Sequence, residues 1–361
     1  MGHCPKTRSI RRRPMTPART RLLKLLLRVV ITAALLTFVF ARVGLGEFAR
    51  TFAIVRLRFL FASWAVTVGI FWVNAWKMRL VLRQQRCHVS LSTLFAVSAL
   101  TVLYSLILPG FLSTGVKWYV LKKETGKGAN VLSAMVYNQV SIFVIMLCAG
   151  YLALLIANPV TLLTDRSGLR GVLPFLSGMF FLLTAVVCLL MIHPRTGRHI
   201  VGTLKRLTTI LPGALRSKGD LVLDQLSTFQ TAGWRFHAVS ALLTIGGHVG
   251  LGILLYIVAA AAADIDVPMG TLAWLCALVY VLGRLPISLA NLGVREVTLI
   301  GALQLYGVAQ PSALLMSMIL FSTVLFMAII GAAVQLYWIG SGGPGPESQT
   351  PDKLPPRVGP V

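Results

Sequence analysis

Long apolar runs recur along this chain, and they constrain its fold more than any other feature. Each is about 20 residues long, which is the length of helix that crosses about 30 Å of hydrocarbon. Hydrophobic residues make up 56% of the 361 residues and charged residues only 12%, so a water-soluble core of this size cannot bury them all. We therefore predict an all-α polytopic membrane protein. The predicted full spans are 22–43, 57–76, 131–157, 172–192, 237–263 and 312–338.

Two further apolar segments, 91–109 and 271–285, are irregular because each ends at a proline and is followed by a linker that contains glycine and serine. Transporters often build their sites from such discontinuous helices, placed at corresponding positions in two inverted halves. Irregular backbone at membrane depth needs protein or a water-filled cavity to satisfy its polar groups. We therefore predict a cavity between the two segments. The predicted structural breaks are Pro109, Gly110, Gly115, Pro286 and Gly293.

Lys and Arg in the loops predict the orientation, because cytoplasmic loops carry the excess of positive charge. If every apolar segment crosses, giving eight spans, the strongly basic linker 193–236 lies outside, against this rule. If 91–123 and 271–306 each enter and leave from one side, the linker lies inside and the acidic turn 264–266 lies outside. We therefore favour six full spans and two oppositely directed re-entrant hairpins over eight spans. The predicted location is a cytoplasmic (inner) membrane, with the N-terminus in the cytoplasm.

The same pattern divides the chain into parts. Apolar density falls in the middle, where Leu and Ile recur at helical spacing among Lys and Arg, which indicates amphipathic helices at the membrane surface. The ends are polar. The predicted parts are a basic cytoplasmic tail (1–21), a membrane domain (22–338) with halves 22–192 and 237–338 joined by the amphipathic linker 193–236, and a disordered polar tail (339–361).

Cations mark the start of the helix that follows each break, Lys117 in the first half and Arg295 in the second. A cation in the first turn opposes the helix dipole, and a membrane makes an unpaired charge more costly, whereas a bound anion reverses that cost. A lipid phosphate is the anion most available there. The alternative is that these cations reach the headgroup region, and that Glu296 is only a structural partner for Arg295. The candidate residues for binding a lipid headgroup are Arg295, Glu296, Arg284, Lys117, Ser288 and Asn291.

Other functions lack support in the residue pattern. The five cysteines are scattered, so they indicate neither a metal site nor a disulfide framework. The net charge of +24 is concentrated in the N-terminal tail and in loops beside apolar runs, where it matches anionic lipid rather than nucleic acid. No paired carboxylates or nucleophile constellation indicate catalysis. We expect membrane lipids as partners, and no enzyme activity, cofactor or metal.

The segment LPISLANLGVRE, residues 285–296, resembles the LPxSxxGxGxRE signature of the flippase-like family, the membrane part of lysylphosphatidylglycerol synthases. Residues 75–79 and 108–117 are similar to that family's first-half motifs. Asn291 replaces the first glycine of the signature. Where the family has two glycines, an acid and an Arg, this chain has Ser113-Thr114-Gly115 and then Lys117, and Asn138-Gln139 replaces an acid-Arg pair. The resemblance covers about 25–335, by the placement of spans.

This resemblance implies paired re-entrant helices around a cavity open to lipid, and a role in moving or presenting a phospholipid-like molecule. The leading hypothesis is a translocase for an anionic phospholipid or a polyprenyl-linked envelope lipid. The alternative is an accessory subunit that does not transport, and that presents a lipid to a glycosyltransferase or another enzyme of envelope biosynthesis.

Overall fold

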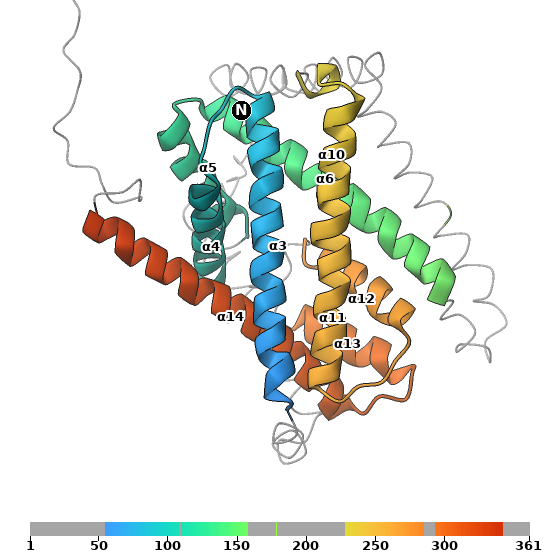
Figure 1. Cartoon of the computed structure of the whole chain (residues 1–361). Coiled ribbons are helices and arrows are strands. Elements are labelled where there is room, and N and C mark those ends of the chain that lie inside the picture. The colour runs from blue at the N-terminus through green and yellow to red at the C-terminus, as the bar shows by residue number, and fades with distance from the viewer. Residues whose placement is uncertain (1–54, 108–109, 158–177, 179–227, 285–292, 342–361) are drawn as a thin grey trace, which may run out of the picture.

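The computed structural model describes residues 55–107, 110–157, 178, 228–284 and 293–341, and all regular elements in these residues are helical. This confirms the predicted all-α class. The helices are α3 (Leu57–Gln84), α4 (Leu91–Ile107), α5 (Gly110–Thr125), α6 (Gly128–Ala157), η2 (Thr228–Thr231), α10 (Trp234–Thr244), η3 (Ile245–Gly250), α11 (Leu251–Ala262), α12 (Met269–Leu282), α13 (Val294–Gln304) and α14 (Gln310–Ser341) (Figure 1).

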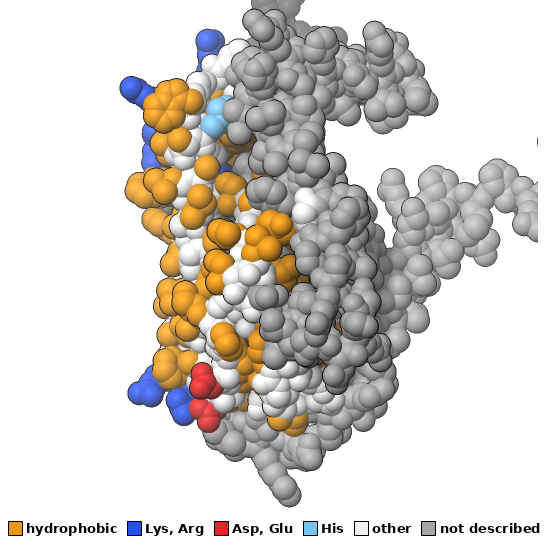
Figure 2. Space-filling model, turned by 90° about the vertical axis from the view of Figure 1, so that its right-hand side faces the viewer, with side chains coloured by type: hydrophobic (Ala, Val, Ile, Leu, Met, Phe, Trp, Pro, Cys, Tyr) orange, Lys and Arg blue, Asp and Glu red, His pale blue; other side chains and the backbone are white. Residues whose placement is uncertain are grey.

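Four helices of the described chain are long and apolar enough to cross a membrane: α3, α6, α14 and the continuous helix Trp234–Ala262 that α10, η3 and α11 form. They match four of the six predicted spans. The predicted spans 22–43 and 172–192 lie outside the described residues, apart from Gly178. Figure 2 shows a face covered by hydrophobic side chains, with Lys and Arg gathered at its two ends. This distribution is that of a multi-pass membrane protein.

The two irregular segments form helices that are shorter than the four candidate spans. Helix α4 has 17 residues and α12 has 14, so at 1.5 Å per residue they extend about 26 and 21 Å. Helix α5 packs against α4, and α13 packs against α12. The first hairpin lies toward the end of α3 at which Gln84 stands, and the second toward the end at which Leu57 stands (Figure 1). The described residues thus contain four of the six predicted spans and two opposed hairpins.

The packing of the two halves is reciprocal. Helix α4 of the first half packs along α14 of the second, and α12 of the second half packs along α6 of the first. Likewise α5 contacts α6 as α13 contacts α14, and α3 lies against α11. Helices α3 and α11 are antiparallel, because the backbone N–H of Arg56 donates to the carbonyl of Ala262 over 3.3 Å. These paired contacts are those expected of an inverted repeat.

Small residues bring both reciprocal pairs into close contact. A Cβ added at Gly331 of α14 would meet the backbone carbonyl of Ala99 in α4. A Cβ added at Gly150 of α6 would meet the side chain of Ala277 in α12. Because lipid is as apolar as leucine, helices in membranes associate through such close backbone approach rather than through burial of apolar surface.

The first hairpin differs from the prediction in one respect. Gly115 was predicted as a break before a short helix that starts at Lys117, but α5 runs unbroken from Gly110 to Thr125. The break was therefore placed wrongly, and Lys117 lies well inside a helix. A single glycine costs a helix about 1 kcal/mol, which is less than the cost of leaving backbone groups unsatisfied in hydrocarbon. Gly110 does begin α5, as predicted, and Pro109 lies outside the described residues.

Other boundaries move by a few residues. Helix α3 continues past Trp76 to Gln84, and α14 ends at Ser341 instead of residue 338. The described end of the linker, η2, lies beside the end of α3, since Gln85 donates a side-chain hydrogen bond to Thr228 over 2.6 Å. The linker therefore ends on the membrane side where the first hairpin begins.

We expect Gly331→Ala to destabilise the protein by about 1–3 kcal/mol, because an added methyl group must push α14 away from the α4 backbone. The matched control is Gly301→Ala in α13, where an added Cβ meets nothing within 4 Å and better helix propensity favours the variant. Thermal unfolding followed by size-exclusion chromatography in detergent measures both. Equal midpoints for the two variants would contradict the close α4–α14 contact.

Candidate functional site

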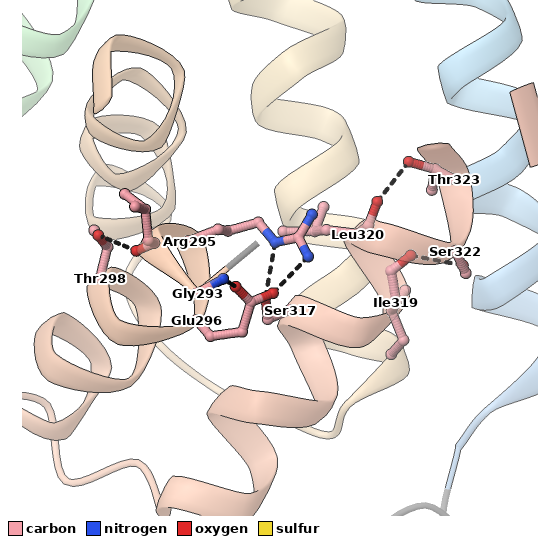
Figure 3. A network of polar contacts seen from close by, with 10 residues as sticks. Gly293, Arg295, Glu296, Thr298, Ser317, Ile319, Leu320, Ser322 and Thr323 are labelled. Atoms are coloured by element: carbon pink, nitrogen blue, oxygen red, sulfur yellow. Dashed lines mark hydrogen bonds and ion pairs between the residues drawn. The ribbon is translucent and has the colours of Figure 1, made fainter. Parts of the chain in front are cut away.

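The second hairpin resumes its helical course at Gly293, where the backbone has a φ of 83°. This left-handed conformation strains any residue with a Cβ, which accounts for the glycine that was predicted as a break. Helix α13 begins at the next residue. The side chain of Glu296 turns back and accepts the N–H of Gly293 over 2.6 Å (Figure 3). A carboxylate thus satisfies the start of the helix and complements its dipole.

Arg295 forms a buried ionic network with Glu296 and Ser317. Its Nη2 donates to Glu296 Oε1 over 2.6 Å, and its Nε donates to Ser317 Oγ over 2.8 Å. Ser317 of α14 in turn donates to Glu296 Oε1 over 2.9 Å (Figure 3). Arg295 is 6% exposed and Glu296 is fully buried. The network neutralises both charges and joins α13 to α14.

In this geometry Glu296 is a structural partner for Arg295, which is the alternative to a role in binding a lipid headgroup. The Glu296 carboxylate accepts three hydrogen bonds, and all three come from groups of the protein itself. Arg295 at the start of α13 has its charge compensated inside the chain. The prediction that these two residues contact a lipid headgroup is not tested by the fold, whereas their role in holding the hairpin is visible in it.

Lys117 lies in the first hairpin without such compensation. Its Nζ donates to Ser98 Oγ of α4 over 3.1 Å, which links the two helices of the hairpin. The side chain is half-buried. None of the described carboxylates forms an ion pair with it.

Lys77 of α3 is a second uncompensated cation, and its side chain is 0% exposed. Its Nζ donates to Ser141 Oγ of α6 over 2.7 Å. No described carboxylate pairs with it either. A fully buried lysine without a counter-ion is rare in a membrane protein, and ionisable residues at such positions usually mark a ligand or ion site.

Arg284 is the third cation, and it is exposed just beyond the end of α12. Its Nη2 donates to the Tyr280 hydroxyl over 2.8 Å, and its guanidinium lies over the same ring, 4.5 Å from the centroid. Gln139 of α6 donates to that hydroxyl over 3.4 Å. Tyr280 therefore connects the second hairpin to α6, two residues before Ser141.

His248 lies in the π-helix η3, which packs against α3 and α6. Its ring meets the ring of Tyr280, the partner of Arg284, edge to face at a centroid distance of 6.3 Å. π-helical segments inside α-helices often occur at functional sites. We call Lys77, Lys117 and Arg284 the cationic cluster.

The cluster has no negative charge of its own among the described residues. Their four carboxylates are Glu124, Asp264, Asp266 and Glu296, and their ion pairs join Arg56 to Asp264 and Arg295 to Glu296. Among the buried polar atoms that lack a hydrogen-bond partner are Asn138 Oδ1 of α6 and His248 Nδ1 of η3. Because buried polar groups are normally paired, this region is suited to an anionic ligand with further polar groups.

The remaining candidates divide between described and undescribed residues. Ser288, Asn291 and Pro286 lie outside the described residues. Arg284 and Lys117 lie in the cationic cluster, and Arg295 and Glu296 form the buried network. Among the described residues there is no group of three or more His, Cys, Asp or Glu that could hold a metal ion.

A comparison with protein families matches residues 25–331 of the 361-residue chain to the family described as the lysylphosphatidylglycerol synthase TM region. The chain belongs to this family. Among curated proteins and solved structures, the comparisons found no match. Membership of the lysylphosphatidylglycerol synthase TM family relates the chain to membrane proteins that handle lipid, and it confirms the resemblance carried by residues 285–296.

Sequence reasoning missed parts of the cluster in this member of the lysylphosphatidylglycerol synthase TM family. Lys77 was quoted in the 75–79 motif but not as a site residue, although a lysine beside a long apolar run is a signal in itself. Tyr280 and His248 give no comparable signal. Their place beside Arg284 depends on how α12 and η3 pack.

We expect Glu296→Gln to destabilise the protein by about 3–5 kcal/mol, because it leaves the Arg295 guanidinium buried without its counter-ion. The matched control is Asp264→Asn, which removes the exposed ion pair with Arg56 at a cost of less than about 1 kcal/mol. The measurement is the yield and thermal midpoint of monodisperse protein in detergent. A Glu296→Gln protein as stable as the control would show that the network does not hold the hairpin.

Proposed function

We propose that this protein binds an anionic lipid headgroup at the cationic cluster and moves the lipid across the membrane, without catalysing a covalent reaction. The observation that carries this proposal is the cluster itself. Three cations, on α3, on α5 and just beyond the end of α12, have no described carboxylate partner. Charges placed in this way inside a membrane protein destabilise its fold unless a ligand compensates them.

A lipid phosphate suits the donors that are present. The guanidinium of Arg284 can form two parallel hydrogen bonds to phosphate oxygens, and each lysine adds a charged donor. Arg284 is exposed while Lys77 is fully buried, so the cluster extends from an accessible edge into the protein. A headgroup can therefore enter from the side of Arg284 while the hydrocarbon chains stay in lipid.

Movement of the lipid is supported by the inverted repeat. In such folds one set of helices rocks against the other around a fixed central site. Here each hairpin packs against the long helix of the opposite half, α4 on α14 and α12 on α6. The two hairpins can exchange roles between states, because the same contacts occur twice in opposite directions.

We further propose that the end of the protein that carries Gln84 is cytoplasmic, in an inner membrane. More of the described Lys and Arg residues lie there, at the ends of α3 and α5 and at the starts of α6 and α10, whereas the opposite end carries Arg56 and Arg58 together with Asp264 and Asp266. This is the distribution that the positive-inside rule predicts. With the predicted span 22–43 crossing once, the N-terminus is cytoplasmic too.

Cysteine labelling tests this orientation. In a variant whose five native cysteines are replaced by serine, Asp266→Cys should react with a membrane-impermeant maleimide on intact cells, because the 264–266 turn faces outward. Lys127→Cys, between α5 and α6, should react only after the membrane is permeabilised. The reverse pattern would overturn the orientation.

The asymmetry of charge favours a second candidate function. The first half has uncompensated cations, while Arg295 in the second half is neutralised by Glu296. A protein with one such site can hold a lipid in place, so a subunit that presents a lipid to a glycosyltransferase or another envelope enzyme fits the same observations. Binding without transport distinguishes this candidate from a translocase.

We expect Lys117→Met to lower lipid binding and transport at least about tenfold, since a hydrogen bond to a charged group contributes about 1.5–3 kcal/mol. The fold should survive, because the change removes an unpaired charge rather than half of a pair. The matched control is Lys122→Met on the same helix, where the side chain is exposed over the Trp118 ring at 5.0 Å.

The assay uses vesicles that contain NBD-labelled phosphatidylglycerol, with dithionite quenching for transport and native mass spectrometry for binding. Equal binding and transport by well-folded Lys117→Met and Lys122→Met proteins would refute the site. Binding that depends on Lys117 without any transport by the wild type would leave the lipid-presenting function in place of the translocase.

A further inference from the structure

We infer that Arg284, Tyr280 and Gln139 together bind a phosphodiester group of the lipid that carries a single negative charge. This inference rests on the proposed function. It names the side chains that hold the headgroup and the charge of the group that they take. Arg284 supplies the only full charge among the three, and Tyr280 and Gln139 supply neutral hydrogen-bond donors.

The hydroxyl group of Tyr280 joins these side chains. Its oxygen accepts from Arg284 Nη2 over 2.8 Å and from Gln139 Nε2 over 3.4 Å. The guanidinium also lies over the ring of Tyr280, 4.5 Å from the centroid. Because the oxygen already accepts two hydrogen bonds, its own proton has no acceptor among the described residues. Arg284, Tyr280 and Gln139 thus bring unused O–H and N–H donors to one place, from α6 and from the second hairpin.

Arg284 and Gln139 are exposed at positions far inside their segments. Helix α12 has 14 residues, so Arg284 lies more than about 20 Å along the second hairpin from its start. Gln139 lies about 16 Å along α6 from Gly128. Hydrocarbon accepts no hydrogen bonds, and a charge exposed to it is costly. The exposed N–H groups of both residues are therefore suited to a ligand that supplies oxygen atoms.

The first hairpin provides an internal comparison, because it contains a pair of the same residue types. Gln335 of α14 donates to the Tyr104 hydroxyl of α4 over 3.1 Å, across the contact that corresponds to α6 with α12. Both side chains are half-buried, and no described Lys or Arg bonds to them. A Tyr–Gln pair with a structural task is thus sheltered and uncharged. In the second hairpin the Gln is exposed and Arg284 is added.

A buried polar atom beside Tyr280 also lacks a partner. The rings of His248 and Tyr280 meet edge to face with their centroids 6.3 Å apart, and His248 Nδ1 is buried without a hydrogen bond. Buried polar groups are normally paired. A headgroup bound against Tyr280 can supply the missing partner through one of its hydroxyl groups, so this atom is a second feature that a ligand would complete.

The charge of the three residues selects the ligand. A phosphodiester carries one negative charge, and two of its oxygens match the paired N–H groups of the Arg284 guanidinium. Tyr280 and Gln139 add hydrogen bonds without adding charge. Neither lysine of the cationic cluster is hydrogen-bonded to any of the three, since Lys77 donates to Ser141 and Lys117 to Ser98. A second negative charge on the ligand would therefore find no cation among Arg284, Tyr280 and Gln139.

The experiment measures binding to the full-length protein in detergent by native mass spectrometry. The probes are dioleoyl phosphatidylglycerol, dioleoyl phosphatidic acid with its phosphomonoester, dioleoylglycerol without a phosphate, and glycerophosphoglycerol without acyl chains. Phosphatidylglycerol should bind at least about tenfold more tightly than dioleoylglycerol, because it adds hydrogen bonds between charged groups. Phosphatidic acid should bind no more tightly than phosphatidylglycerol. Tenfold tighter binding of phosphatidic acid would overturn the single charge.

Two variants test the neutral donors. Tyr280→Phe and Gln139→Met each remove a donor to the phosphate, so each should weaken phosphatidylglycerol binding about tenfold and leave dioleoylglycerol binding unchanged. The matched controls are Tyr104→Phe and Gln335→Met, which make the same changes in the pair of the first hairpin and should keep wild-type binding. An equal loss for phosphatidylglycerol and dioleoylglycerol would assign Tyr280 and Gln139 a structural role and overturn the inference.

Further outcomes separate this inference from the proposed function. Phosphatidylglycerol binding that survives Tyr280→Phe and Gln139→Met but is lost in Lys117→Met would overturn the inference and leave the proposed function intact. Binding that survives all of these changes and Arg284→Met would overturn both. Glycerophosphoglycerol that binds as tightly as phosphatidylglycerol would overturn the lipid as ligand and show a site for a soluble phosphodiester.

Discussion

The absence of water in hydrocarbon is the constraint on which the rest of this structure depends. Every backbone polar group at that depth must be satisfied within the protein, so the chain forms helices there. Helices α4 and α12 are shorter than the candidate spans, with 17 and 14 residues. A long helix of the other half packs along each of them, α14 along α4 and α6 along α12. The reciprocal packing thus places protein beside both hairpins.

The same constraint acts on charged side chains, and the two halves meet it in different ways. In the second half Glu296 compensates Arg295, caps the start of α13 and connects it to α14 through Ser317. In the first half Lys117 has a serine for a partner. Lys117, Lys77 and Arg284 have no described carboxylate partner, so their charges lower the stability of the folded protein. A cost of this kind is retained where function needs it, since natural proteins give up stability at their working sites.

Much of the fold could be predicted from the sequence because hydrophobic periodicity and length are local properties. The spans that begin near Leu57, Gly128, Trp234 and Gln310 were predicted within a few residues. The prediction of two hairpins followed from the prolines and from the charges in the loops. Gly115 was misread, since glycine favours a break only where the freed backbone can be satisfied. That condition depends on the surrounding helices and not on the residue itself.

The sequence by itself determined that the chain lies in a membrane, that it is helical and that it contains two broken segments with nearby cations. It also contained the motif at 285–296 by which the family is recognised. Only the tertiary structure decided which cations are compensated. Arg295 has Glu296 beside it in the sequence, yet its second partner, Ser317, comes from α14. Lys77, Lys117 and Arg284 are far apart along the chain, and electrostatic energy depends on separation in space, so the packing of the helices, and not the sequence, decides how these charges act on one another.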